Sequence, residues 1–318
     1  MPEAARPAKN RLHEDGRLSS RYWNLPMTFS SVLLETLRAW ASPAREHSLL
    51  CYALVDAAQN PSLWRRFAER FDSAPILASA ESLSPHLVLL GRHDQLPGNL
   101  PALHPQALPA DLTLLCSPFR LAELREHFSW YTKAALPGGI EMGLAFWDPV
   151  ILGSLVGQSD DGTLHVKGPV LSPEQKAQFL GPIAAWWYGD REEMIHRVDG
   201  LDEPVLPAMN RLLILDQAQE DALVEASVPD QVLYHLESNR SPLFDGELPH
   251  HRRYRFIRAV LPSARQLGLE GLRDLVNFTA FCLIYRQRIQ TDPEILQLLD
   301  QVQKKAISFD EALAQMPE

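Results

Sequence analysis

The stretch LLCYALVDAAQNPSLWRRFAERF, residues 49–71, decides the fold class. Its first part, LLCYALVDA (49–57), is a continuous apolar run that ends at a turn, as expected of a β-strand covered on both faces. Its second part, NPSLWRRFAERF (60–71), spaces large apolar residues such as Leu63 and Phe67 along one side of an α-helix. A buried strand followed by an amphipathic helix predicts an α/β layer architecture.

The same alternation continues for about 140 residues. The apolar runs HLVLLG (86–91), LTLLCS (112–117) and EMGLAFW (141–147) predict further strands, and FRLAELREHFSWYTKAAL (119–136) has helical spacing between the last two. A proline-rich stretch without a helical pattern joins the runs 86–91 and 112–117. We therefore expect a mixed sheet flanked by helices.

The last third of the chain is helical in pattern. RLLILD (211–216) predicts one strand that returns to the sheet, and the residues after it have apolar stripes at helical spacing. Asp216 with Gln219, and Ser308 with Glu311, form capping-box patterns that mark helix starts. We expect an α/β lobe followed by an all-α lobe, with these boundaries: a disordered tail over 1–28, the α/β lobe over 29–190, a connection over 191–215 and the helical lobe over 216–318.

Five junctions share a short polar residue followed by proline. The polar side chain accepts a hydrogen bond from the first helical turn, and proline fills the first helical position, where its missing N–H costs nothing. Asparagine, serine and aspartate are interchanged in this role, so the position requires a hydrogen-bond acceptor and not an acid. Asp148 in LAFWDPVIL is therefore interpreted as a helix cap. The predicted caps are Asn60, Ser117, Asp148, Ser172 and Asp292.

Composition and charge exclude several classes of protein. The net charge of −10 opposes general binding to nucleic acid, which requires a basic face. No run of 18 apolar residues is present, and the N-terminus lacks the apolar core of a signal peptide, so we expect a cytoplasmic protein without membrane insertion. Cys51, Cys116 and Cys282 lie in separate apolar runs, which favours buried thiols over a disulfide framework or a zinc site.

The sequence carries no recognised catalytic motif. It lacks a phosphate-binding glycine loop, a GxSxG elbow and an HExxH pair, so no catalytic residue, cofactor or metal site is predicted. Asp56 is the best remaining candidate, because it ends a predicted strand and α/β active sites gather at such ends. An aspartate before AAQNP also makes an ordinary turn, and both interpretations stay open.

Two segments suggest contact surfaces instead. Three consecutive aromatic residues cannot all face one core from a helix, so at least one is expected to be partly exposed at an interface; the alternative is that they close the gap between the two lobes. The stretch HHRRYRFIR (250–258) is either a solvated helix face or a surface that docks an acidic partner. The candidate partner-binding residues are Trp186, Trp187, Tyr188, Arg252, Arg253 and Arg255.

Taken in order, these motifs resemble the effector adaptor and chaperone family of bacterial type VI secretion (Tap type). The segments that carry the resemblance are CYALVDAAQNPSLW, SPHLVLLG, LLCSPFRLAELREHFSWYTKAALPGG, LAFWDPVILGSLV and LSPEQKAQFLGPIAAWWY, with RLLILDQAQEDAL after them. The first five of these segments span roughly residues 49–190. One position departs from the family pattern, because the arginine usual in the strand before the Asp-Pro pair is Ala145 here.

The resemblance implies a protein that is not an enzyme. Such adaptors work in the cytoplasm, bind a cognate toxic effector and help load it onto the VgrG spike, and they are usually encoded beside both partners. We expect the cleft between the two lobes to hold an apolar segment of the effector. Two alternatives remain open: a hydrolase that uses Asp56, and a scaffold that binds the spike without an effector.

Overall fold

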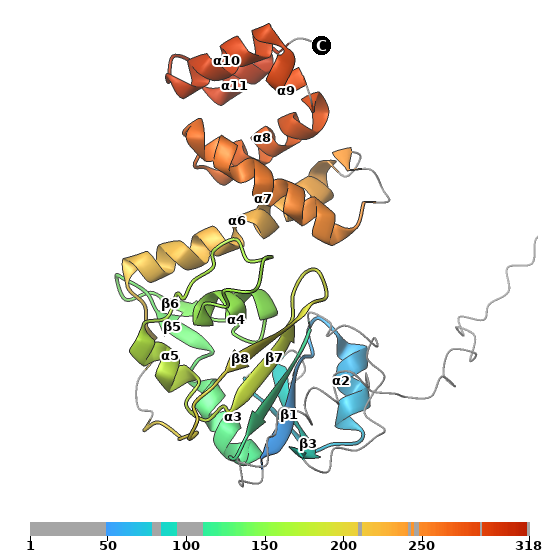
Figure 1. Ribbon diagram of the computed structural model, residues 1–318, viewed down its shortest axis with the longest axis vertical. Coiled ribbons are helices and arrows are strands. Elements are labelled where there is room, and N and C mark those ends of the chain that lie inside the picture. Colours follow the sequence, from blue (N-terminus) through green and yellow to red (C-terminus); the bar gives the residue numbers. More distant parts are fainter. Residues whose placement is uncertain are drawn as a thin grey trace, which may run out of the picture.

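The computed structural model shows an α/β lobe and a helical lobe stacked along the long axis of the molecule (Figure 1). The expected tail over 1–28, most of the proline-rich stretch before residue 111 and the first residue of RLLILD lie outside the described residues. The structure describes residues 49–77, 84–93, 111–208, 212–240, 243–244, 248–286 and 288–316.

A six-stranded sheet forms the centre of the α/β lobe. Its strand order is β2-β3-β1-β4-β7-β8, and every neighbouring pair is antiparallel. The strands are β1 (Leu50–Asp56), β2 (Ser73–Pro75), β3 (Pro85–Arg92), β4 (Leu112–Ser117), β7 (Ala185–Gly189) and β8 (Ile195–Asp199). β8 lies within the stretch 191–215 that was expected to be a connection.

The expected mixture of strand directions lies in a second, small sheet. This sheet joins β5 (Lys133–Ala135), β6 (Glu141–Gly143) and β9 (Leu213–Ile214) in the order β6-β5-β9. β5 is antiparallel to β6 and parallel to β9, so RLLILD does return a strand, but to this sheet and not to the large one. The predicted class, an α/β lobe with a flanked sheet and a helical C-terminal lobe, is confirmed.

Both faces of the large sheet are covered, which explains why β1 is apolar throughout. Alternate residues such as Tyr52 and Leu54 face a core that is shared with the helices after β4, and we call this the main core. Cys51 and Val55 face the opposite side, which is covered by α2 (Pro61–Ala68). Cys51 lies opposite Cys116 of β4 with the two Sγ atoms 2.9 Å apart, and both are buried free thiols, as predicted.

The aromatic triplet Trp186, Trp187 and Tyr188 lies in β7 and is fully buried. Trp186 and Tyr188 belong to the main core, whereas Trp187 packs on the α2 side. The expectation that one of them is exposed was wrong, because a strand turns neighbouring side chains to opposite faces and both faces are covered here. The triplet lies inside the α/β lobe and does not close a gap between lobes.

Four of the five predicted caps are confirmed. The side chains of Asn60, Asp148, Ser172 and Asp292 accept hydrogen bonds from the first turns of four proline-started helices. Three of these helices are α4 (Pro149–Val156), α5 (Pro173–Phe179) and α10 (Pro293–Gln303), and the fourth is α2.

Ser117 is the exception among the predicted caps. It is the last residue of β4, and its hydroxyl donates to the carbonyl of Pro182 at 2.6 Å, so it belongs to the sheet and not to a helix start. The helix that follows, α3 (Leu121–Ser129), begins later, after Arg120. The helix α3 also ends earlier than the pattern over 119–136 predicted, because Lys133–Ala135 form the strand β5.

The helical lobe is built from α6 (Gln217–Arg240), α7 (His250–Gln266), α8 (Leu272–Tyr285), α9 (Arg288–Thr291), α10 and α11 (Phe309–Ala314). α6 belongs to both lobes: Leu223 packs against the main core, and Leu236 lies in the core of the helical lobe. Figure 1 shows α6 running from the top of the α/β lobe into the helical lobe. Within the described residues, no helix combines the length and the apolar character needed to cross a bilayer.

Candidate functional site

A cleft of about 820 Å³ lies where α6 crosses the α/β lobe. One wall comes from the segment that runs from β6 into α4, including Met142, Ala145 and Ile151. The other wall is a face of α6, whose residues recur at the three- and four-residue spacing that places helical side chains on one side. These α6 residues are Val224, Ser227, Asp230 and Tyr234.

The cleft exposes apolar surface. Val224 is 56% exposed and Tyr234 is 67% exposed, although both are large apolar side chains of an ordered helix. Exposed apolar side chains that gather around a hollow are typical of a binding surface. The volume lies within the range of sites that enclose small molecules or peptide side chains.

Asp148 has two roles at this cleft. Its Oδ1 atom accepts hydrogen bonds from the backbone N–H groups of Val150 and Ile151, which is the predicted capping role. The same residue also lines the cleft. Burial raises the pKa of Asp148, and the two backbone hydrogen bonds and the nearby Arg191 guanidinium only partly oppose this rise. Asp148 is therefore a cap that also lines a largely apolar hollow.

Arg191 joins the two lobes. It lies in the turn between β7 and β8, its side chain is only 12% exposed, and its guanidinium forms an ion pair with Asp230 of α6. The guanidinium carbon also lies 3.9 Å from the centre of the Tyr254 ring of α7, a cation–π contact. Nothing in the polar stretch REEMIH marked this residue, because its two partners lie 39 and 63 positions away.

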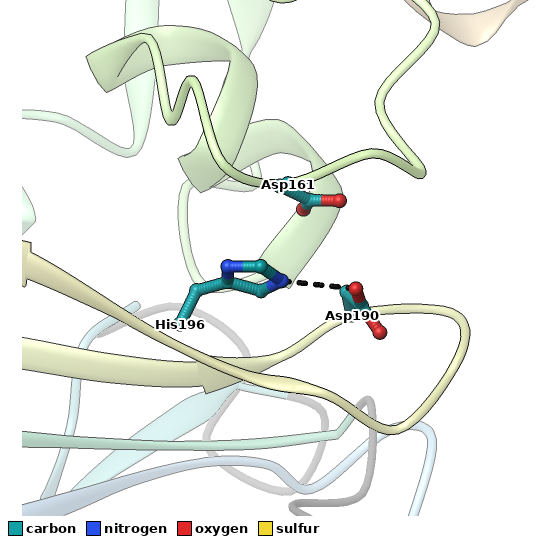
Figure 2. Close-up of side chains that lie close together, drawn as sticks. All are labelled: Asp161, Asp190 and His196. Carbon is teal, nitrogen blue, oxygen red and sulfur yellow. Dashed lines mark hydrogen bonds and ion pairs between the residues drawn. The ribbon is translucent and has the colours of Figure 1, made fainter.

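A cluster of Asp190, His196 and Asp161 holds the turn that carries Arg191 (Figure 2). The Nε2 atom of His196 lies 2.9 Å from Oδ2 of Asp190. Oδ1 of Asp190 accepts hydrogen bonds from the N–H groups of Glu192 and Met194, which closes the turn.

The electrostatics of the cluster favour a protonated imidazole. Burial lowers the pKa of His196, but the hydrogen bond to Asp190, the contact of Nδ1 with Asp160 at 3.2 Å and the negative charge of Asp161 together outweigh it, so the net shift is upward. Asp161 contributes further negative charge and accepts hydrogen bonds from Thr163 and from the Tyr188 hydroxyl.

The cluster also contains residue types that bind divalent metals. One ligand atom from each of the three residues lies within 4.8 Å of the others. The carboxylate oxygens of Asp161 and Asp190 already accept hydrogen bonds from the protein, and these bonds account for the arrangement. An aspartate and a histidine that flank a short polar turn are the local pattern by which Asp190 and His196 could have been found.

The arginines of HHRRYRFIR serve mainly to hold the protein together. Arg255 forms an ion pair with Glu192 of the α/β lobe, and Arg258 donates to the carbonyl oxygen of Gly162 at 2.7 Å. Arg253 pairs with Glu237 inside the helical lobe at 3.0 Å. Arg255 is 63% exposed, so the interpretation as a solvated helix face holds for it, whereas Arg253 is only 21% exposed and is paired inside the helical lobe.

Arg252 is exposed on α7.

A second bridge reinforces the junction between the lobes, since Glu225 of α6 contacts His165 at 3.0 Å and Arg265 at 2.7 Å.

Asp56 makes a turn. Its Oδ1 accepts hydrogen bonds from the N–H groups of Ala58 and Gln59, and its Oδ2 accepts one from the indole of Trp147 at 3.2 Å. Within the part of the chain that the structure describes, no imidazole or hydroxyl group is hydrogen-bonded to this carboxylate. Its contacts favour the interpretation as a turn over that as a catalytic acid.

The fold and the cleft define a two-lobed α/β protein with a largely apolar hollow where α6 crosses the α/β lobe. Residues 51–165 match the model of a family described as a domain of unknown function, DUF4123. This family is associated with the effector adaptors of type VI secretion, which confirms the family resemblance seen in the motifs. Neither the curated proteins nor the solved structures contain a match to the chain.

The matched region covers one side of the cleft. It runs from β1 through α4 to the loop after it, and so includes Ala145 and Asp148. The α6 wall and Arg191 lie beyond it. Ala145, where the family usually has arginine, forms part of the cleft wall, and Arg191 is a cation at this cleft from a different segment.

Proposed function

We propose that the protein is an adaptor that binds a cognate type VI effector in the cytoplasm and helps to load it onto the VgrG spike. The match to the DUF4123 model supports the adaptor class. The finer parts of the proposal, which are the effector, the spike and the place of action, follow from the family resemblance.

The interlobe cleft is the observation that carries the proposal. Its apolar side chains, Val224 and Tyr234 among them, remain in contact with water although a packed core lies directly beneath α6. Covering such surface with an apolar segment is favourable by about 25 cal/mol for each Å² removed from water. The cleft would thus shield an apolar part of the effector before delivery, and a second surface would contact the spike.

We also propose that the protein is not an enzyme. Asp56, the residue on which the hydrolase alternative depends, uses both carboxylate oxygens to hold a turn and the Trp147 indole. The scaffold alternative differs from the adaptor in one testable respect, because a scaffold would bind the spike when no effector is present.

The test is co-expression with candidate effectors and VgrG proteins from the same genome, followed by affinity purification and size exclusion. Tyr234→Asp and Val224→Asp place a charge in the cleft at exposed positions and are expected to abolish the effector complex. Ile284→Asp is the matched control, since Ile284 is 58% exposed on α8 and does not line the cleft.

Three outcomes count against the proposal. Wild-type protein that forms no complex with the effector would contradict the adaptor function. Cleft variants that bind the effector as well as the control does would show that the effector binds at another surface. Stable binding to VgrG without the effector, and no binding of the effector itself, would favour the scaffold.

A further inference from the structure

The charges that line the interlobe cleft are not balanced. Two carboxylates, Asp148 and Asp230, share the cleft with one guanidinium, that of Arg191. Arg191 forms its ion pair with Asp230 and stacks on Tyr254. Asp148 is thus left with no ion pair to a basic side chain among the described residues.

The second oxygen of Asp148 has hydrogen-bonding capacity to spare. Both capping hydrogen bonds, from Val150 and Ile151, go to Oδ1, and no described residue donates to Oδ2. A carboxylate in largely apolar surroundings is stabilised when a cation reaches it, and burial raises the pKa of Asp148 although the charge of Arg191 partly opposes the rise. Ile151 and Met142, which also line the cleft, make its surroundings apolar.

We propose that the segment bound in this cleft belongs to the effector and combines apolar side chains with one basic side chain, arginine or lysine, that pairs with Asp148. This inference rests on the proposed function, and it adds the chemistry of the segment that is recognised. Apolar side chains would cover Val224 and Tyr234 on α6, and the basic group would reach the opposite wall at the start of α4. The excess of one carboxylate in the cleft, in a chain of net charge −10, supplies the charge complementarity.

The central test is a pair of substitutions at equivalent caps. Asp148→Asn removes the charge and keeps an oxygen that caps α4 about as well as aspartate does. Asp292→Asn makes the same change at the cap of α10, outside the cleft. The probe is the effector that co-purifies with the wild-type protein in the co-expression test, and its affinity is measured by calorimetry at low and at physiological salt.

We expect Asp148→Asn to weaken effector binding by about tenfold or more and to reduce its dependence on salt. Asp292→Asn is expected to bind as the wild type does. Equal binding by both variants overturns the inference but leaves the adaptor function intact. Failure of the wild-type protein to bind the effector would contradict both this inference and the adaptor function.

A charge swap tests the same contact without touching the cap. Ala145 lies in the cleft wall three residues before Asp148, so Ala145→Arg places a cation beside the carboxylate and is expected to repel the basic effector segment. Changing the basic residue of that segment to glutamate is expected to restore binding to this variant. Loss of binding without such rescue contradicts the pairing.

The occupant itself is identified by crosslinking. A photoreactive amino acid at position 224 is expected to capture an effector peptide that contains arginine or lysine. Capture of a peptide without a basic residue overturns the inference. So does capture of residues 1–48 of the same chain, or of a second copy of it, because the cleft would then be filled by the protein's own segments.

Discussion

Arg191→Ala is expected to loosen the contact between the two lobes while leaving each lobe folded. The arginine touches the α/β lobe through its own turn, α6 through Asp230 and α7 through the Tyr254 ring. Removing its side chain therefore breaks two contacts between the lobes at once.

The size of the effect depends on the exposure of the partners. Asp230 is 41% exposed, so water can solvate its carboxylate after the arginine is gone, and the ion pair contributes about 1 kcal/mol, well below the value for a buried pair. The contact with Tyr254 is largely desolvated and contributes about 1–2 kcal/mol. We expect a total of about 2–3 kcal/mol, which is a factor of about 30 to 150 in the equilibrium between docked and separated lobes.

The distribution of tryptophan makes this measurable. All 7 tryptophans precede α6 in the sequence, and those among the described residues lie in the α/β lobe, so tryptophan fluorescence is used to follow that lobe. Far-ultraviolet circular dichroism reports on the helices, most of which lie in α6 to α11. In urea, the two signals of the wild type are expected to change together, and those of Arg191→Ala to separate, with the helical signal lost first.

The control is Arg197→Ala on β8. Arg197 is 46% exposed and pairs with Asp199, which is 67% exposed, so its loss is expected to cost less than about 0.5 kcal/mol. Coincident transitions in Arg191→Ala, with a midpoint no lower than that of Arg197→Ala, would refute the role of Arg191 in joining the lobes.

Four further predictions concern Gly200, His127, His196 and the thiol of Cys282. Gly200→Ala is expected to lower the unfolding free energy by more than about 2 kcal/mol in urea titrations, because its Cβ would overlap a backbone carbonyl oxygen, whereas Gly162→Ala, with open space around it, is expected to be neutral. Burial lowers the pKa of His127 to about 4, so its contribution to stability falls as pH drops from about 6.5, by about 1.4 kcal/mol per unit, and His127→Gln is expected to remove this slope. The pKa of His196 is raised, so this residue contributes stability that is present below pH 6.5 and is lost as pH rises through its folded pKa. NMR titration is expected to show His196 still protonated at a pH at which His127 is already neutral. Burial raises the pKa of the Cys282 thiol to about 12, and native protein is expected to react with iodoacetamide far more slowly than protein unfolded in urea; equal rates would contradict the burial.

Features that depend on neighbours in sequence were predictable. The apolar run of β1 and the helical spacing of α2 gave the right elements within one or two residues at most boundaries, and the polar residues before prolines marked four helix starts. These signals act over a few residues, so the chain carries them without reference to the rest of the fold.

Features that depend on partners distant in sequence were not. Trp187 is buried because α2 covers its side of the sheet, and Ser117 ends a strand because β1 pairs with it. The cleft could be placed between the lobes from the family resemblance alone, but its walls could not. The junction formed by Arg191 and Asp230 had no local signature, since each is an ordinary charged residue until the lobes meet.

The position of α6 in two hydrophobic cores restricts how such proteins can diversify. Leu223 completes one core and Leu236 the other, so a break anywhere in this helix strips apolar cover from at least one lobe. A helical lobe exchanged between relatives would have to bring α6 with it and still match the recipient's main core. Point changes on the exposed side of the helix escape this restriction, and that side includes the wall of the cleft.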